Sequence, residues 1–272
     1  MQIMLQSPGL STEQITHSLH ERYSPETVIS SDGIDLKTAS AVLFLLGQCP
    51  DRGRLGGKPC LILSKRSANV RQPGDLCCPG GRIHPHLDGI LATLLKLPIL
   101  PLSRWPYWAE WIQLHPRGAG WLRLLLATGL RESVEEIRLN PCGLKLLGPL
   151  PPQPLLMFKR MIYPLVMWLT GQKRFHPNWE VEKIIYIPLQ DLLNPARYAS
   201  YRLRFETQPA AVEPSTFPCF RYQKENETEL LWGATYRITM VFLKDVFGFE
   251  PPAVDSLPQI HGRLSRAYLN IP

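Results

Sequence analysis

The chain has 272 residues, of which 44% are hydrophobic and 19% charged, and its formal net charge is +7. This length and composition exclude a disordered chain and predict a globular protein with a large core. The basic balance favours a polyanionic partner. Because the sequence has no dense Lys/Arg block and no nucleic-acid-binding motif, we expect a phosphate-bearing small molecule and no nucleic acid.

The predicted elements begin with a helix over residues 11–23, where Ser11 and Gln14 form a capping-box pattern. Buried strands are expected at 39–47 and 58–66, followed by a turn-rich segment at 72–82 with two adjacent glycines. Further strands are expected at 143–150, 160–169, 181–189, 198–205 and 217–223, and a long amphipathic helix at 227–248 that stops at Gly248. These elements predict an α+β fold, an α/β/α sandwich around a mixed β-sheet.

Residues 89–126 are unusual because they are apolar, rich in proline and contain Trp105, Trp108 and Trp111. We expect two short helical pieces, broken at 98–101 and at 116–120, with the next helix starting near Trp121. A disordered loop would be polar, so this segment is predicted to pack. Its apolar side chains are expected to bury against the domain, against a second copy in a homodimer, or over the mouth of a substrate site: Leu91, Leu94, Leu95, Trp105, Trp108 and Trp111.

Three glutamates of that next helix lie within about a 100° arc, since positions i, i+3 and i+4 share one face of a helix. They are Glu132, Glu135 and Glu136, directly after Arg131. Like charges at this spacing repel. The cluster is either a solvated face with Arg131 and Arg138 as counter-ions, or a set of oxygen ligands for a divalent cation such as Mg²⁺.

The cysteine spacing and the apolar segments indicate the cellular compartment and whether the chain spans a membrane. The six cysteines form no CxxC pair and no disulfide-scaffold spacing, which is typical of free thiols in a reducing environment. The two most apolar windows, 90–102 and 155–169, are broken by charged residues and prolines, so no transmembrane segment is expected. The first residues show no signal-peptide pattern, and we expect a cytoplasmic protein.

The glutamate stretch resembles the second half of the Nudix hydrolase motif. That motif reads Gly, five residues, Glu, seven residues, Arg-Glu-apolar-x-Glu-Glu-x-Gly-apolar. Arg131, Glu132, Glu135 and Glu136 match it, with Leu139 as the last apolar residue and Gly81 as the starting glycine. The arginine would be expected at 95 and stands at 131, so 36 extra residues divide the motif.

Two further stretches resemble the coenzyme A diphosphatase branch of the family. The lead-in of that branch has an Arg-Ser pair, an arginine, a glycine and Phe-Pro-Gly-Gly, and a later helix carries Trp-Gly-Ala-Thr. The matching residues are Arg66, Ser67, Arg71, Gly74, Pro79, Gly80 and Gly81, and then Trp232, Gly233, Ala234 and Thr235. The resemblance implies a Nudix domain over 38–250 with an insertion at about 89–126, an N-terminal extension over 1–37 with a short helix, and a C-terminal tail over 251–272.

The resemblance also implies roles for individual residues. Glu135, Glu136 and the Gly80 carbonyl would bind Mg²⁺ or Mn²⁺, and Glu132 would be a further ligand or the base that orients water. Arg131 would hold the glutamates in place. Arg66, Arg71 and Gly81 would bind the substrate phosphates, although either arginine can equally be a surface residue at a strand end. Glu180, Glu182 and Glu229 are alternative distal ligands or bases, for which a strand-edge surface role is expected first.

Two departures from the motif affect the expected site. The first motif glutamate would fall at Leu87, where the adjacent Asp88 can stand in. The motif glycine is replaced by Arg138, and a left-handed conformation there would cost a non-glycine residue about 1 kcal/mol. We therefore expect the helix to run on to Asn140–Pro141.

Together these features predict an enzyme that hydrolyses the diphosphate bond of a nucleoside-diphosphate derivative, with coenzyme A or an acyl-CoA as the expected substrate. Two alternatives stay open. The chain can be a nucleotide-binding module with weakened catalysis, or a Nudix hydrolase for another substrate such as a nucleotide sugar.

Overall fold

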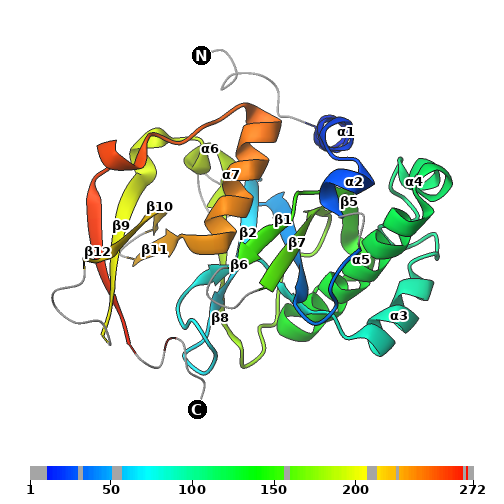
Figure 1. Ribbon diagram of the computed structural model, residues 1–272, viewed down its shortest axis with the longest axis horizontal. Helices are drawn as coiled ribbons and strands as arrows, with labels where there is room; N and C mark the ends of the chain where they lie inside the picture. Colours follow the sequence, from blue (N-terminus) through cyan, green and yellow to red (C-terminus); the bar gives the residue numbers. More distant parts are fainter. Residues whose placement is uncertain are drawn as a thin grey trace.

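A mixed eight-stranded sheet forms the centre of the computed structural model, which describes residues 11–29, 33–50, 57–155, 160–206, 213–224, 227–265 and 268 (Figure 1). The main path of this sheet has the order β3-β2-β1-β7-β5, with β4 beside β1, β6 beside β7 and β8 beside β2. Its strands are β1 (Ala39–Gln48), β2 (Pro59–Arg66), β3 (Leu76–Cys77), β4 (Gly80–Arg82), β5 (Leu144–Pro149), β6 (Gln153–Leu155), β7 (Arg160–Leu169) and β8 (Val181–Pro188). Strands β1 and β7 are parallel and the other pairs antiparallel.

Alternate residues of β1 enter different cores, because side chains alternate between the two faces of a strand. Leu43 and Leu45 belong to the core beneath α5 (Pro116–Ile137), whereas Phe44 and Leu46 belong to the core with α7 (Gly233–Phe247). Helix α1 (Thr12–Arg22) packs on the α7 side, with Leu19 fully buried. The predicted α/β/α arrangement around a mixed sheet is therefore confirmed.

A second sheet of four strands, not predicted from the sequence, lies at the opposite end of the molecule from α3 and α4 (Figure 1). Its order is β11-β10-β9-β12, made of β9 (Tyr198–Phe205), β10 (Ser215–Lys224), β11 (Glu227–Leu231) and β12 (Gln259–Leu264). The prediction of one helix over 227–248 was wrong at its start, since 227–231 pair with β10 and the helix begins at Gly233. The predicted stop at Gly248 is confirmed by its left-handed φ of 63°.

Residues 85–115 form two helices joined by turns. Helices α3 (Pro85–Leu94) and α4 (Trp108–Leu114) precede α5, and the remaining short helices are α2 (Pro25–Val28), α6 (Leu189–Leu192), η3 (Pro141–Gly143), η5 (Pro195–Arg197) and η6 (Val254–Ser256). The predicted break at 98–101 is confirmed, but the predicted break at 116–120 was wrong. Helix α5 already starts at Pro116, since proline suits the first helical position, where its missing N–H has no partner to lose.

The packing predicted for this segment is confirmed for most of its side chains. Leu95, Trp105 and Trp111 are buried, and Leu91 and Trp108 pack partly against the same core. Leu94 differs, because 48% of its surface is exposed. None of the helices in the described ranges is long and apolar enough to cross a membrane.

Candidate active site

Gly80 and Gly81 allow close backbone and side-chain approaches next to the glutamates, where a larger residue would not fit. Gly80 has a φ of 139°, and a Cβ there would lie 2.4 Å from the Ala41 carbonyl oxygen of the neighbouring strand. At Gly81 an added Cβ would lie 2.5 Å from the carboxyl carbon of Glu132. The Gly-Gly pair therefore allows β4 to pair with β1 and allows the Glu132 carboxylate to rest on the β4 backbone.

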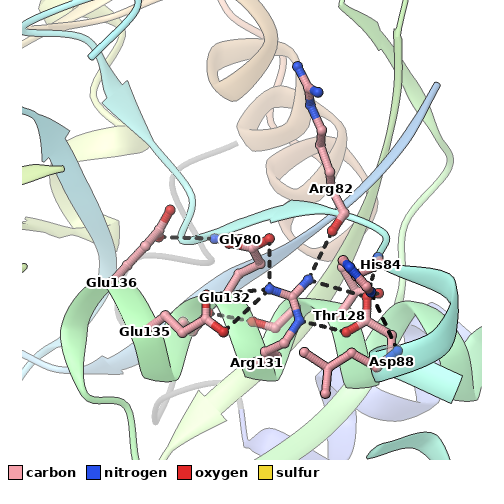
Figure 2. Close-up of polar contacts among 12 residues, drawn as sticks. Gly80, Arg82, His84, Asp88, Thr128, Arg131, Glu132, Glu135 and Glu136 are labelled. Atoms are coloured by element: carbon pink, nitrogen blue, oxygen red, sulfur yellow. Dashed lines mark hydrogen bonds and ion pairs between the residues drawn. The ribbon is translucent and has the colours of Figure 1, made fainter. Parts of the chain in front are cut away.

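Arg131 joins α3, β4 and α5 through one guanidinium group, as Figure 2 shows. Its Nε donates to Asp88 Oδ1 at 2.6 Å, and Nη2 donates to the Arg82 carbonyl oxygen at 3.0 Å. On the other side, Nη1 lies 3.0 Å from Glu132 Oε1 and 3.4 Å from Glu135 Oε2. Such charge-assisted contacts fix the position of the glutamates relative to the glycine turn.

Asp88 is fully buried and its carboxylate is fully hydrogen-bonded. Besides Arg131, it accepts from the Thr128 hydroxyl at 2.7 Å and from the His84 backbone N–H at 2.7 Å. Burial raises the pKa of Asp88, but the hydrogen bonds from Arg131, His84 and Thr128 outweigh it, and the pKa lies below its usual value. Asp88 thus supplies the buried acid next to Arg131, whereas Leu87 lies at the surface with 42% of its area exposed.

Glu132 and Glu136 line a cavity of about 790 Å³ together with Glu180. Glu136 Oε2 accepts from the Gly80 N–H at 3.2 Å, so the nearest Gly80 group is its N–H. Burial raises the pKa of Glu136 to about 8, and the charges of Glu132 and Glu180 contribute to the increase. Burial also raises the pKa of Glu132. Carboxylates that resist ionisation in a cavity are a frequent feature of functional sites.

Glu135 lies apart from these two residues. Its side chain is 54% exposed, it contacts Arg131 and it does not line the cavity. Glu182 and Glu229 also lie elsewhere, in ion pairs with Lys65 at 3.4 and 3.1 Å. Glu180, for which a surface role was expected first, is the alternative acid that does line the cavity.

The cavity is rich in arginines. Arg66 and Arg71, predicted as phosphate ligands, both line it. Arg66 Nε donates to the Arg71 carbonyl oxygen at 2.7 Å, which links the two residues across the turn after β2. Three further arginines line the cavity and were not singled out from the sequence: Arg82, Arg160 and Arg237. Arg237 could have been found, because it lies about one helical turn after Gly233 of the Trp-Gly-Ala-Thr stretch and so shares its side of the helix.

The Trp-Gly-Ala-Thr stretch lines the same cavity at the start of α7. Trp232 Nε1 donates to Asp75 Oδ1 at 3.0 Å, and the Tyr268 hydroxyl donates to the other Asp75 oxygen. Burial raises the pKa of Asp75 to about 6, although both hydrogen bonds act in the opposite direction. Phe217 and Trp179 complete the aromatic part of the lining, and sequence reasoning missed both.

The donor set has the chemistry that a hard divalent cation needs, since Glu132, Glu136 and Glu180 offer only oxygen ligands. A cation there would offset the burial and the repulsion from Glu132 and Glu180 that together raise the pKa of Glu136. In this conformation, however, no three acidic, histidine or cysteine side chains within the described ranges are gathered closely enough to hold a metal ion. Glu132 is held instead by Arg131 and Glu136 by the Gly80 N–H.

Arg138 ends the glutamate helix, and the prediction that the helix continues to Asn140–Pro141 was wrong. Helix α5 stops at Ile137, and Arg138 adopts a left-handed conformation with a φ of 55°. The backbone carbonyl oxygen of Arg138 accepts a hydrogen bond from Gln172 Nε2 at 3.0 Å, and Gln172 Oε1 accepts one from the Asn140 N–H at 2.7 Å. These hydrogen bonds offset the backbone strain that a glycine would avoid.

Comparison with curated proteins finds a similar protein. The chain is 29% identical over 117 residues to a protein described as an uncharacterized Nudix hydrolase, NudL, from Pectobacterium atrosepticum. The match covers 43% of this chain and 56% of that relative, so the chain spans little more than half of its length. A scan against models of protein families finds no match.

Solved structures with similar arrangements carry Nudix descriptions, at low similarity. The Nudix hydrolase RenU from M. smegmatis is 14% identical with a TM-score of 0.36, over 61% of this chain and 80% of that one. A Nudix hydrolase from Alicyclobacillus acidocaldarius is 16% identical with a TM-score of 0.36, over 59% and 82%. The Nudix domain of Shewanella oneidensis NrtR, solved with ADP ribose, is 14% identical with a TM-score of 0.35, over 65% and 85%. The match to NudL supports a relationship to the Nudix hydrolases.

Proposed function

We propose that this protein is a Nudix hydrolase that cleaves the diphosphate bond of a nucleoside-diphosphate derivative, with coenzyme A or an acyl-CoA as its substrate. One observation carries the proposal. Three stretches that resemble the coenzyme A diphosphatase branch, far apart in the sequence, line one cavity: the lead-in with Arg66 and Arg71, the glutamate helix with Glu132 and Glu136, and Trp232–Thr235.

The chemistry of the cavity suits a polyphosphorylated substrate. Diphosphate hydrolysis requires neutralisation of charge on the phosphoryl oxygens and an aligned water molecule. Arg66 and Arg71 bind phosphate oxygens, with Arg71 on the 3′-phosphate of coenzyme A, and Arg82, Arg160 and Arg237 add positive charge to the cavity. The aromatic side chains Trp232 and Phe217 offer apolar surface to an adenine or acyl group.

The glutamates act on the reacting water and on the cation. Glu136, with Glu180 beside it, would hold Mg²⁺ or Mn²⁺, and Glu135 would join them after leaving Arg131. When bound, the cation neutralises charge on the diphosphate oxygens and lowers the pKa of water. Glu132 accepts the proton of the attacking water, while Arg131 and the Gly80–Gly81 turn keep its carboxylate in place.

The cytoplasm is the compartment we infer for this activity. All six cysteines lie within the described residues and are free thiols, which suits a reducing environment.

The test is a product analysis with purified protein and Mg²⁺ or Mn²⁺. The substrates would be coenzyme A, an acyl-CoA, dephospho-coenzyme A, NADH, ADP-ribose and a nucleotide sugar. We expect coenzyme A to give 3′,5′-ADP and phosphopantetheine, and the Glu136→Gln variant to give neither. Hydrolysis of only a nucleotide sugar would reject the coenzyme A assignment, and tight substrate binding without turnover would identify a binding module.

A further inference from the structure

Exposed apolar side chains are concentrated in one segment of the molecule. Of the eight large hydrophobic residues that are exposed in the described ranges, seven lie between positions 87 and 114, and the eighth, Trp179, lines the cavity. The seven are 42–65% exposed: Leu87, Ile90, Leu94, Leu97, Ile99, Ile112 and Leu114. Single exposed hydrophobics need no explanation, but a concentration of this kind marks an interaction surface.

Helix α3 has two apolar faces. Ala92 and the following Leu95 are buried with Asp88 on the side that packs against α5. Leu87, Ile90 and Leu94 are spaced i, i+3 and i+7, so they lie within about 60° of one another on a second face that α5 leaves uncovered. A surface helix that only needs to pack on its own domain has a polar outer face, whereas the exposed side of α3 carries three large apolar residues beside His86 and Thr93.

Further exposed apolar residues follow α3 in the sequence. Leu97 and Ile99 follow in the turns that leave the helix, and α4 adds Ile112 while its Trp111 is buried. Figure 1 shows α3 and α4 at the same end of the molecule, away from the four-stranded sheet. We call the exposed apolar residues of 87–114 the apolar end face.

The charges around the apolar end face are mostly positive. Between positions 83 and 120 the exposed charged residues are Lys96, Arg104, Glu110 and Arg117, because Asp88 is buried. The one exposed acid, Glu110, lies 3.4 Å from His20. A second copy of the chain bound through the same face in a twofold dimer would place these cations against each other, which disfavours self-association.

We propose that the apolar end face docks the protein on the surface of an anionic lipid bilayer. Leu87, Ile90 and Leu94 enter the boundary between headgroups and acyl chains, and Lys96 and its neighbouring cations contact the anionic headgroups. The protein docks on the bilayer without a spanning helix, since no described helix is suited to cross it.

The test is flotation of the full chain with vesicles. Vesicles of pure phosphatidylcholine are compared with vesicles that contain about one third phosphatidylserine, at low and high salt. We expect the wild type to float with the anionic vesicles, less at high salt. The combined Leu87→Gln, Ile90→Gln and Leu94→Gln variant should lose at least about tenfold in partitioning. Lys96→Glu with Arg117→Glu should lose more than the matched surface control Lys145→Glu with Arg174→Glu.

Folding and assembly are measured on the same samples. Circular dichroism must give the glutamine variant a native spectrum, and its hydrolysis of a water-soluble diphosphate should equal that of the wild type. If the wild type does not float with any vesicle, the proposal is overturned. It is also overturned if light scattering shows a wild-type dimer that becomes a monomer in the glutamine variant, because the face is then a protein interface.

Discussion

Asp88 and Glu136 are two acids of the candidate active site, and their environments differ. Asp88 is fully buried with donors from a guanidinium, a hydroxyl and a backbone N–H, and its pKa is lowered. Glu136 faces the cavity with one backbone N–H and two neighbouring acids, and its pKa is raised to about 8. The comparison separates a carboxylate whose hydrogen-bond donors outweigh its burial from one whose burial and acidic neighbours outweigh a single backbone hydrogen bond and the charge of Arg66.

The largest expected effect is on activity. Glu136→Gln should lower kcat by about three orders of magnitude or more, since loss of a metal ligand removes several kcal/mol of transition-state stabilisation. In the metal-free protein the raised pKa means that ionising Glu136 opposes folding as pH rises from 4.5 to about 8. The variant should therefore melt no lower than the wild type at pH 9 without metal. Near-normal kcat would assign the reaction to other residues.

Asp88→Ala should have the largest effect on stability. It leaves the Arg131 guanidinium without its shortest ion pair, and breaking a buried pair costs about 3–5 kcal/mol. Urea denaturation would measure the loss, and Thr128→Val is the matched control that removes one hydrogen bond for about 1 kcal/mol. Because the pKa of Asp88 is lowered, its contribution should be present at neutral pH and disappear in acid. Equal losses of unfolding free energy in the two variants would contradict the claim that the Asp88–Arg131 ion pair stabilises the fold.

Asp75 lies between these two cases, because it is hydrogen-bonded like Asp88 but its pKa is raised like that of Glu136. Its pKa of about 6 lies above the ordinary 3.8, so ionisation costs folding free energy as pH rises through this interval. Asp75→Asn should stabilise the protein relative to the wild type by roughly 1–3 kcal/mol at pH 7 and by much less at pH 4. Melting temperatures measured across this range would test it. A difference that does not change with pH would mean that the Asp75 carboxylate is charged at no cost.

The smallest effect concerns substrate recognition. If Arg71 binds the 3′-phosphate, Arg71→Ala should lower kcat/KM for coenzyme A more than for dephospho-coenzyme A, by a factor that corresponds to about 1 kcal/mol. The comparison of two substrates on one variant cancels any general loss of folding. Equal losses on both would show that Arg71 does not read this phosphate.

The sequence predicted local features well, because neighbours along the chain determine them. The strands at 39–47 and 58–66 and the capping box at Ser11 were confirmed. The amphipathic pattern over 227–248 predicted one helix, but residues 227–231 pair with β10, and this long-range pairing decides their structure. Arg138 was expected to extend α5, yet hydrogen bonds from Gln172, 34 positions away, support a left-handed end.

In the candidate site, too, the sequence predicted local motifs but not contacts between distant residues. The glutamates and the glycine pair belong to short motifs that can be read from the sequence. Contacts such as Asp88 with Thr128, 40 positions apart, depend on the packing of α3 against α5. Arg160, Trp179 and Phe217 reach the cavity from separate strands and loops, so no local pattern marks them.

The most direct test of the central claim is the number of protons released when Mn²⁺ binds. Calorimetric titrations in buffers of different ionisation enthalpy give this number. Since the pKa of Glu136 is about 8 without metal, binding at pH 7 should release close to one proton, and binding at pH 9 almost none. Glu136→Gln should abolish the release, whereas the surface control Glu227→Gln should retain it. Binding without proton release at pH 7, or unchanged release in Glu136→Gln, would contradict the assignment of Glu136 as the carboxylate that receives the cation.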